Sequence, residues 1–235
     1  GTNKPMVPAN VDKGIGYYCD DTGNYLSTVE LGTALRKMGG VDVLGLLSCG
    51  EQTIEVVYEV SDSVKVVVGS EEVSDTDDYR YRLFMEQISS NPSITNEEIG
   101  KLLVLQYRHE VRPTCLSAIR TENLPTLMNH IRLFTELAIS EDPALLKKAA
   151  KGTYGINPEF EFSDQSDLVD SVKSFMEQTK NERFKAAGRT VIDYYMNEVL
   201  IYAANSHNRR LLGASVYLPI STYRESYDTL RFAKD

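Results

Sequence analysis

The sequence contains no tryptophan and only three cysteines in 235 residues. Because three thiols cannot all pair, a disulfide framework does not describe this chain, and at least one thiol is free unless two copies join through it. The sequence also lacks an apolar run of the roughly 18 residues that a membrane-spanning helix needs, and no charged-then-apolar leader follows Gly1. These absences argue against a membrane span and against a fold held together by disulfides.

Basic residues are also scarce, with 25 Lys and Arg against 34 Asp and Glu and a net charge of −9. Proteins that bind nucleic acid or anionic membranes usually carry a basic stripe, whereas these Lys and Arg residues are scattered among carboxylates. The composition therefore argues against nucleic acid as a partner. No repeat or long linker divides the chain, and its 42% hydrophobic residues can bury a sizeable core, so we expect one domain over residues 1–235.

A strand–helix–strand unit is predicted in the first third of the chain. Residues 41–48 (VDVLGLLS) form a nearly continuous apolar run between glycines, which is typical of a strand buried on both faces. Residues 51–60 then carry apolar side chains at helical spacing, and residues 64–69 (VKVVVG) predict a second strand. Two strands joined by a helix within about 30 residues form a parallel crossover unit.

Most of the remaining chain is predicted to be helical. Ser27 with Glu30, and Thr95 with Glu98, make capping boxes, in which two side chains three residues apart satisfy free backbone groups at a helix start. Further helices are predicted at residues 124–139, 143–151 and 167–179, and strands at residues 199–204 and 214–218. We therefore expect an α/β fold with a mostly parallel sheet flanked by helices and a helical insertion in the C-terminal half.

Chemically active side chains follow both predicted strands of the crossover unit. Cys49 ends the first strand, and Ser70, Glu71 and Glu72 follow the second, with Asp77 a few residues on. Ligands of parallel sheets bind beyond the carboxyl ends of the strands, so this arrangement predicts a nucleophile beside a pocket for a cation. A cysteine at the end of a buried strand is more often a core residue, and an acidic run is more often a solvated loop, so the residues alone leave both interpretations open.

Several short motifs share their order and spacing with one known family. Residues 20–35 contain Asp20-Asp21-Thr22, Tyr25-Leu26, Glu30-Leu31 and Ala34-Leu35, similar to a DDTSGDYL…EL..AL segment. Residues 44–60 are similar to GFDACLMGMVEVAYEL, residues 70–81 to SEELEPGDGWDY, and residues 204–206, 215–219 and 227–235 to a closing pattern. Together these motifs resemble the clostripain-like cysteine peptidases, which have a caspase-like fold, over nearly the whole chain.

The resemblance implies an endopeptidase in which a Cys–His dyad cleaves peptide bonds after Arg or Lys. Cys49 falls at the nucleophile position, and its backbone N–H is expected to help bind the oxyanion, together with a Gly after the catalytic His. Asp77 falls at an acidic position that faces the basic residue before the cut, and Ser70, Glu71 and Glu72 are expected to pair with the substrate like a strand. The chemistry requires no cofactor.

The first departure from the family concerns the general base. His109, His130 and His207 all follow Cys49, whereas the family's His-Gly pair precedes the nucleophile. Three explanations remain open: the His lies on a separate light chain after self-cleavage, the chain begins just after the His with Gly1 as the Gly of the pair, or the protein is an inactive relative. We favour the first two, because Cys49 is retained and the first strands of the sheet are also missing from the sequence. Each internal His is interpreted as a surface or helix-capping residue.

The second departure is Leu47, where the family often has an Asp that shares the cation pocket. Leu at this position removes half of the usual negative charge and is expected to weaken the preference for Arg or Lys. Of the other thiols, Cys19 is interpreted as half-buried and Cys115 as part of the core. Asp20 and Asp21 are candidates for calcium, which some relatives require, although two adjacent carboxylates are weak evidence for a metal site.

These observations lead to the expectation of a cysteine endopeptidase that acts on peptides or proteins and, as in its relatives, outside the cytoplasm of a bacterium. The alternative is a catalytically inactive relative that binds peptides through the same groove. A flavodoxin-like binding domain is a third interpretation, but the turn Ser48-Cys49-Gly50 has too few glycines to hold a phosphate.

Overall fold

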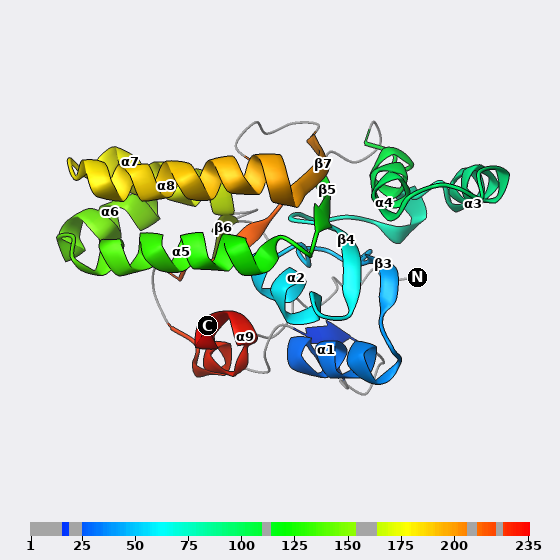
Figure 1. The fold of residues 1–235 in the computed structure, drawn as a ribbon, viewed down its shortest axis with the longest axis horizontal. Coiled ribbons are helices and arrows are strands. Elements are labelled where there is room, and N and C mark those ends of the chain that lie inside the picture. The colour runs from blue at the N-terminus through cyan, green and yellow to red at the C-terminus, as the bar shows by residue number, and fades with distance from the viewer. Residues whose placement is uncertain (1–15, 19–24, 110–113, 154–163, 206–210, 220–222) are drawn as a thin grey trace, which may run out of the picture.

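The computed structural model describes residues 16–18, 25–109, 114–153, 164–205, 211–219 and 223–235. A sheet lies at the centre of the molecule, with helices on both of its faces and a helical arm on one side (Figure 1). The α/β class is confirmed. Among the described residues, no helix is long and apolar enough to cross a membrane.

The central sheet has four strands in the order β3-β4-β5-β7: β3 (Val41–Gly45), β4 (Val64–Ser70), β5 (Cys115–Arg120) and β7 (Leu200–Asn205). β3 and β4 are parallel, as the crossover unit predicts, with Val43 opposite Val66. β5 is antiparallel to both of its neighbours, β4 and β7. The described sheet is therefore mixed, and the expectation of mostly parallel pairing does not hold for these strands.

The two faces of the sheet contribute to separate hydrophobic cores, because successive side chains of a strand point to opposite faces. Val67 and Ile119 face helix α2 (Ile54–Val60), all of whose residues are buried. Val66 and Val68 face helix α4 (Asn96–Leu105). Gly100 allows α4 to lie close to the sheet, since a Cβ there would come within 2.6 Å of Val66 Cγ1.

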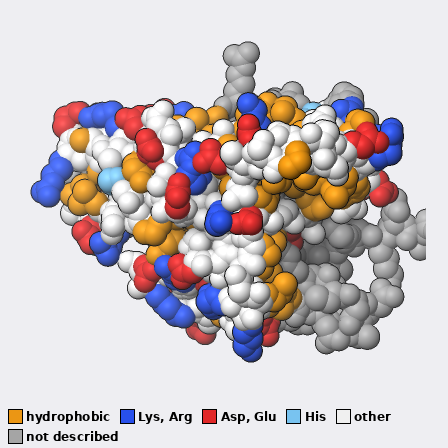
Figure 2. Space-filling view, turned by 45° about the vertical axis from the view of Figure 1, so that its right-hand side comes forward, with side chains coloured by type: hydrophobic (Ala, Val, Ile, Leu, Met, Phe, Trp, Pro, Cys, Tyr) orange, Lys and Arg blue, Asp and Glu red, His pale blue; other side chains and the backbone are white. Residues whose placement is uncertain are grey.

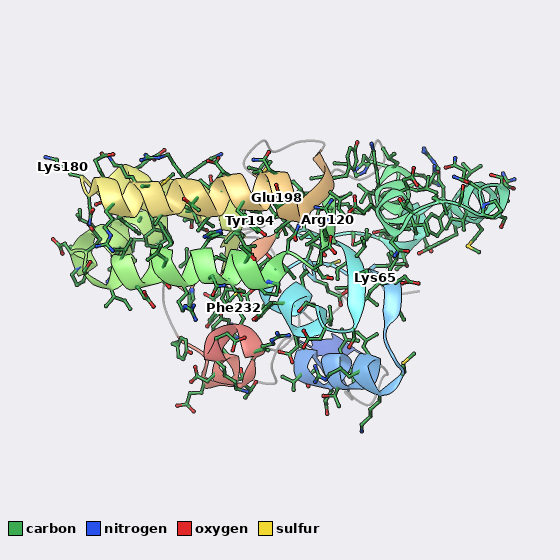
Figure 3. All side chains as sticks on the ribbon, viewed as in Figure 1. Lys65, Arg120, Lys180, Tyr194, Glu198 and Phe232 are labelled. Atoms are coloured by element: carbon green, nitrogen blue, oxygen red, sulfur yellow. The ribbon has the colours of Figure 1, made fainter. Side chains whose placement is uncertain are left out.

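Four helices form the arm at the left of Figure 1, which is the predicted helical insertion. They are α5 (Leu124–Ile139), α6 (Pro143–Gly152), α7 (Leu168–Gln178) and α8 (Glu182–Tyr194). α5 packs along α8, and stacked rings of Phe134 and Phe184 with centroids 4.6 Å apart lie between them. A π-helical turn, Tyr195–Val199, links α8 to β7. Figure 3 shows Arg120 at the end of β5 beside Glu198 in this turn, and the guanidinium donates to the Glu198 carbonyl oxygen.

Shorter elements surround the sheet. β1 (Gly16–Tyr18) and β2 (Tyr25–Ser27) form an antiparallel pair, and β6 (Gln165–Asp167) pairs with β8 (Ser215–Tyr217). Helix α1 (Thr28–Lys37) packs against α2, α3 (Tyr81–Ser90) lies beside α4, and α9 (Arg231–Lys234) ends the chain against α2. Both predicted capping boxes are present, at the starts of α1 and α4.

Several predicted boundaries need correction. Residues 41–48 do not form one strand buried on both faces, because β3 ends at Gly45 and, among the described strands, lies at the sheet edge with Asp42 and Gly45 exposed. The helix predicted from residue 51 begins at Ile54, where Thr53 caps its first turn. β8 pairs with β6 and not with the central sheet.

Candidate active site

Cys49 lies in the loop that follows β3, beyond the carboxyl end of that strand. The sequence predicts this position. The backbone N–H of Leu46 donates to Val68, which continues the pairing with β4 past the end of β3. Gly50 adopts a φ of 67° and donates its N–H to the Glu72 carbonyl oxygen at 3.0 Å. A positive φ favours glycine, so Gly50 turns the chain directly after the cysteine. The sulfur of Cys49 is thereby placed between the ends of two parallel strands.

The thiol of Cys49 is partly exposed and contacts the backbone of Ser74. Cys49 Sγ donates to the Ser74 carbonyl oxygen at 3.2 Å and accepts from the Ser74 N–H at 3.4 Å. A thiolate only accepts hydrogen bonds, so ionisation would keep the contact with the N–H and lose the one with the carbonyl. The Ser74 N–H can therefore hold the sulfur of Cys49 in either protonation state, whereas the contact with the Ser74 carbonyl oxygen requires the thiol.

Glu51 is a buried carboxyl group two residues after the nucleophile candidate. Burial raises its pKa from 4.5 to about 7, although hydrogen bonds from the backbone and hydroxyl of Ser48 favour the charged form. A carboxyl group with this pKa changes charge near neutral pH. The ionisation of Glu51 is thus expected to alter the electrostatics around Cys49 in the pH range where peptidases work.

The segment after Ser74 carries Asp77 and a cluster of aromatic rings. A 3₁₀ turn, Thr76–Asp78, begins at Asp75, whose carboxylate accepts the Asp77 N–H at 3.0 Å. Asp77 is exposed, and its charge raises the pKa of Tyr81 after the larger effect of burial. An exposed carboxylate at the rim is suited to meeting a cation on a ligand.

Tyr79 lies at the centre of the aromatic cluster. Its ring stacks on Tyr81 with centroids 5.7 Å apart and meets the ring of Tyr107 edge-on at 4.8 Å. Burial raises its pKa, and the neighbouring acids Tyr107, Tyr81, Glu51 and Cys49 raise it further. Tyr79 thus belongs to the same segment as Asp77 and packs between Tyr81 and Tyr107.

The structure does not place Ser70, Glu71 and Glu72 as an exposed pairing edge. All three are buried. Ser70 O accepts from the Gln52 N–H, the Glu71 N–H donates to Cys115 O, and the Glu72 N–H donates to Ser70 Oγ. These backbone groups are already bonded within the chain. The three residues therefore belong to the buried structure around the site and do not offer a free strand edge to a peptide.

Glu71 takes part in a buried acidic cluster that the sequence did not reveal. Its Oε1 accepts from the Gly213 N–H and from Cys115 Sγ, the latter at 3.3 Å. Asp167, which accepts the N–H groups of Leu212 at 2.6 Å and Asp170 at 2.7 Å, acts electrostatically on Glu71. Burial raises the pKa of both carboxyl groups, and the charge of Asp167 raises that of Glu71 further.

Of the remaining candidates, His109 lies at the aromatic cluster, with its ring edge-on to Tyr107 at 5.1 Å between centroids and its Nε2 3.2 Å from the Val104 carbonyl oxygen. His130 on α5 packs against Tyr194 on the arm. Cys115 is buried, as predicted. Gly1, Cys19, Asp20, Asp21 and His207 lie outside the described residues, so the oxyanion and calcium interpretations that depend on them stay predictions. Within the described part of the chain, no group of three or more His, Cys, Asp or Glu side chains could hold a metal ion.

Tyr79 and Asp167 are site residues that the sequence reasoning did not single out for a role. Tyr79 stood within a recognised motif, where Trp is usual in the family, and this replacement was the available signal. Asp167 comes from β6, between the second and third helices of the insertion, and no local pattern links it to Glu71.

Comparisons with known proteins agree with this geometry. The model of the clostripain family (Peptidase_C11) matches residues 4–234. A B. fragilis cysteine protease is similar in structure, with a TM-score of 0.70, 14% identity, and coverage of 93% of this chain and 96% of that one. No curated protein sequence matches the chain.

Two further solved structures are similar. A clostripain from Bacteroides thetaiotaomicron in complex with the peptide inhibitor BTN-VLTK-AOMK has a TM-score of 0.65 and 14% identity, over 93% of this chain and 97% of that one. An inactive zymogen of a C11 protease from Parabacteroides distasonis has a TM-score of 0.65 and 16% identity, over 87% of this chain and 61% of that one. These similarities confirm the caspase-like fold, and the family match covers almost the entire sequence. The chain therefore belongs to the clostripain family of cysteine peptidases.

Proposed function

We propose that this chain carries the nucleophile of a cysteine endopeptidase. The observation that carries the proposal is the partly exposed thiol of Cys49, held against the Ser74 backbone at the end of the parallel strands β3 and β4. In the mechanism, the Cys49 thiolate attacks the scissile carbonyl, the amine leaves, and water hydrolyses the acyl-enzyme. The Cys49 backbone N–H is the proposed oxyanion donor on this chain.

The general base is proposed to be a histidine from outside the described residues. His109 and His130 make the contacts described above with Val104 and Tyr194, which suit structural roles. His207, which also lies outside the described residues, follows Cys49, whereas the family's His precedes the nucleophile. The base is therefore proposed to come from another chain or segment, such as a light chain. Its role is to take the proton from Cys49 and return it to the leaving amine.

The proposed substrates are peptides or proteins cut after Lys or Arg. Asp77 is an exposed carboxylate on the segment next to the Cys49 loop, and carboxylates bind guanidinium and ammonium groups through charge-assisted hydrogen bonds. The inhibitor bound to the B. thetaiotaomicron clostripain has VLTK as its peptide part. Another similar structure is that of a secreted C11 cysteine protease from the same organism. It has a TM-score of 0.69 and 16% identity, over 92% of this chain and 65% of that one. This similarity supports action outside the cytoplasm.

Cleavage by the native protein, with every chain that co-purifies with it, tests this proposal. Peptides with Arg, Lys or Leu before the cut are incubated with wild type, Cys49→Ala and Cys115→Ser, and the products are identified by mass. We expect cleavage after Arg and Lys that Cys49→Ala abolishes. Cys115→Ser is the matched control, because its hydroxyl can still donate to Glu71, and it should retain activity. Folded wild-type protein that cleaves none of the peptides would instead favour the inactive, peptide-binding alternative.

A further inference from the structure

The hydroxyl group of Tyr79 is buried without a hydrogen-bond partner among the described residues. The side chain is only 5% exposed, and its Oη has no donor or acceptor within reach. Nearly all buried polar groups in folded proteins are hydrogen-bonded, and the exceptions call for a physical explanation. One explanation is that a ligand supplies the missing partner.

The Tyr79 ring is fixed in place by its neighbours. Tyr81 stacks on one side, Tyr107 meets the ring edge-on, and Tyr107 Oη also accepts the Asp75 N–H at 3.2 Å. The loop that holds the ring is the same loop whose Ser74 contacts Cys49 Sγ. The orientation of the phenol is therefore set before any ligand arrives, and such preorganisation favours binding.

The surroundings of this hydroxyl favour a cationic ligand. Among the titratable groups that act on it, Glu51 carries a negative charge when ionised, whereas Tyr107, Tyr81 and Cys49 are neutral at neutral pH. Asp77 acts in the same way on Tyr81, the stacking partner. An ammonium or guanidinium group carries only donors, and a phenol oxygen accepts hydrogen bonds.

Two sequence features point to the same residue. Leu47 stands where the family often has an Asp that shares the cation pocket, so this chain lacks one acceptor there. Tyr79 stands where the family motif has Trp. The indole N–H of Trp can only donate, whereas the tyrosine oxygen can accept. Compared with the family motifs, Leu47 thus removes an acceptor from the pocket, and Tyr79 adds one.

We propose that Tyr79 is a specificity-determining residue whose hydroxyl accepts a hydrogen bond from the cationic end of the substrate residue before the cut. This role rests on the proposed peptidase function. Glu51, buried in the loop after Cys49, acts electrostatically on Tyr79 and adds negative charge when it is ionised. Asp77 supplies charge beyond Tyr81, at the exposed rim.

Two peptides that differ only in the residue before the cut test this role. One carries Lys and the other norleucine, which has a similar length without the ammonium group. The ratio of their kcat/KM values is measured for wild type, Tyr79→Phe and a control, Tyr194→Phe, which lies on α8 in the helical arm (Figure 3). Because one hydrogen bond to a charged group is lost, we expect Tyr79→Phe to lower the Lys-to-norleucine ratio about tenfold.

The thermal midpoint provides a second readout. Since the Tyr79 hydroxyl has no partner in the described structure, its removal should leave the midpoint unchanged or raise it, and Tyr194→Phe should leave the ratio unchanged. Cleavage that still requires Cys49 but shows an unchanged ratio in Tyr79→Phe would overturn the inference alone. An equal fall for both peptides, or a lowered midpoint, would do the same, because either indicates a structural role. No Cys49-dependent cleavage of either peptide would overturn the peptidase proposal and this inference with it.

Discussion

At the residue scale, three carboxyl groups of the candidate site differ in their environments. Asp77 is exposed, whereas Glu51 and Glu71 are buried. Burial disfavours the charged form of a carboxyl group, so the exposed Asp77 is suited to meeting a cation, whereas the buried Glu51 and Glu71 hold their protons more tightly. Position within the fold therefore decides whether an acidic residue of this region stays charged or titrates near neutral pH.

Glu51 makes stability depend on pH near neutrality. The folded state binds the proton more tightly than the unfolded state, since burial raises the pKa from 4.5 to about 7. Stability from this group is therefore fully present below pH 4.5 and is lost as the pH rises towards 7. Between pH 5 and 8 the loss amounts to about 2–3 kcal/mol. Urea unfolding at pH 5 and pH 8 should show this loss of stability in wild type. The loss should be absent in Glu51→Gln.

Glu30→Gln is the matched control for Glu51. Hydrogen bonds from the backbone and side chain of Ser27 lower the pKa of Glu30, so this group titrates below pH 5. Its replacement should leave the change between pH 5 and 8 as it is in wild type. If Glu51→Gln behaves like Glu30→Gln, the carboxyl group at position 51 is not buried as the structure describes.

At the scale of secondary-structure elements, local signals predicted most helices. The boundaries of α5, the two capping boxes and the strand β4 agree with the sequence patterns, because each depends on residues close in sequence. β5 was not predicted, since its six residues (CLSAIR) owe their strand conformation to pairing with β4 and β7. Missing this strand explains why mostly parallel pairing was expected.

The site was predictable to a similar extent. Cys49 follows a strand and belongs to a motif, so the sequence alone locates it. The environment of Ser70, Glu71 and Glu72 was not predictable, because it depends on Cys115, Asp167 and the loop at Gly213, which come from distant segments. Gly213 is itself required there, with a φ of 105° and Ser117 Cβ 2.7 Å from where its own Cβ would lie.

The buried acidic pair connects three elements: Glu71 follows β4 and accepts from Cys115 at the start of β5, and Asp167 ends β6 and caps α7. Gln at position 71 can donate its amide to Asp167 and still accept from Gly213, so it imitates protonated Glu71. Both carboxyl groups have a raised pKa, so wild type should lose stability as the pH rises above the unfolded values of about 4. Glu71→Gln should reduce this loss in urea unfolding.

Glu71→Ala is the contrasting variant for the same junction. It leaves the Gly213 N–H and the Cys115 thiol without their acceptor, and we expect a cost of at least about 2 kcal/mol. Equal destabilisation by Gln and Ala would contradict a proton held by this buried pair.

At the scale of the whole molecule, the C-terminal segment is fastened to the helix that follows the nucleophile loop. Glu55 on α2 accepts from the Tyr217 N–H at 2.8 Å and from Tyr227 Oη at 3.0 Å. Tyr58 on the same helix donates to Asp235 at 2.6 Å.

Elsewhere on the surface, basic and acidic side chains are interspersed on the face in Figure 2, which agrees with the scattered charges of the sequence.

Removing one of these contacts should loosen the C-terminal segment. Tyr227→Phe loses a hydrogen bond to a buried carboxyl group, and we expect a cost of about 1.5–3 kcal/mol in urea unfolding. Faster hydrogen exchange should accompany it in residues 223–235. Tyr223→Phe is the control, because Tyr223 is 55% exposed, and its cost should stay within about 0.5 kcal/mol. Equal effects of the two variants would refute a specific role for the Glu55 contact.

Covalent labelling of Cys49 tests the central claim most directly. The native protein, with its co-purifying chains, is treated with a peptidyl electrophile that ends in Lys, and the modified residue is mapped by mass spectrometry. We predict one label per chain, on Cys49, which persists in Cys115→Ser and disappears in Cys49→Ala. Folded protein in which Cys49 stays unlabelled, or in which the label falls on another residue, would contradict the assignment of Cys49 as the nucleophile.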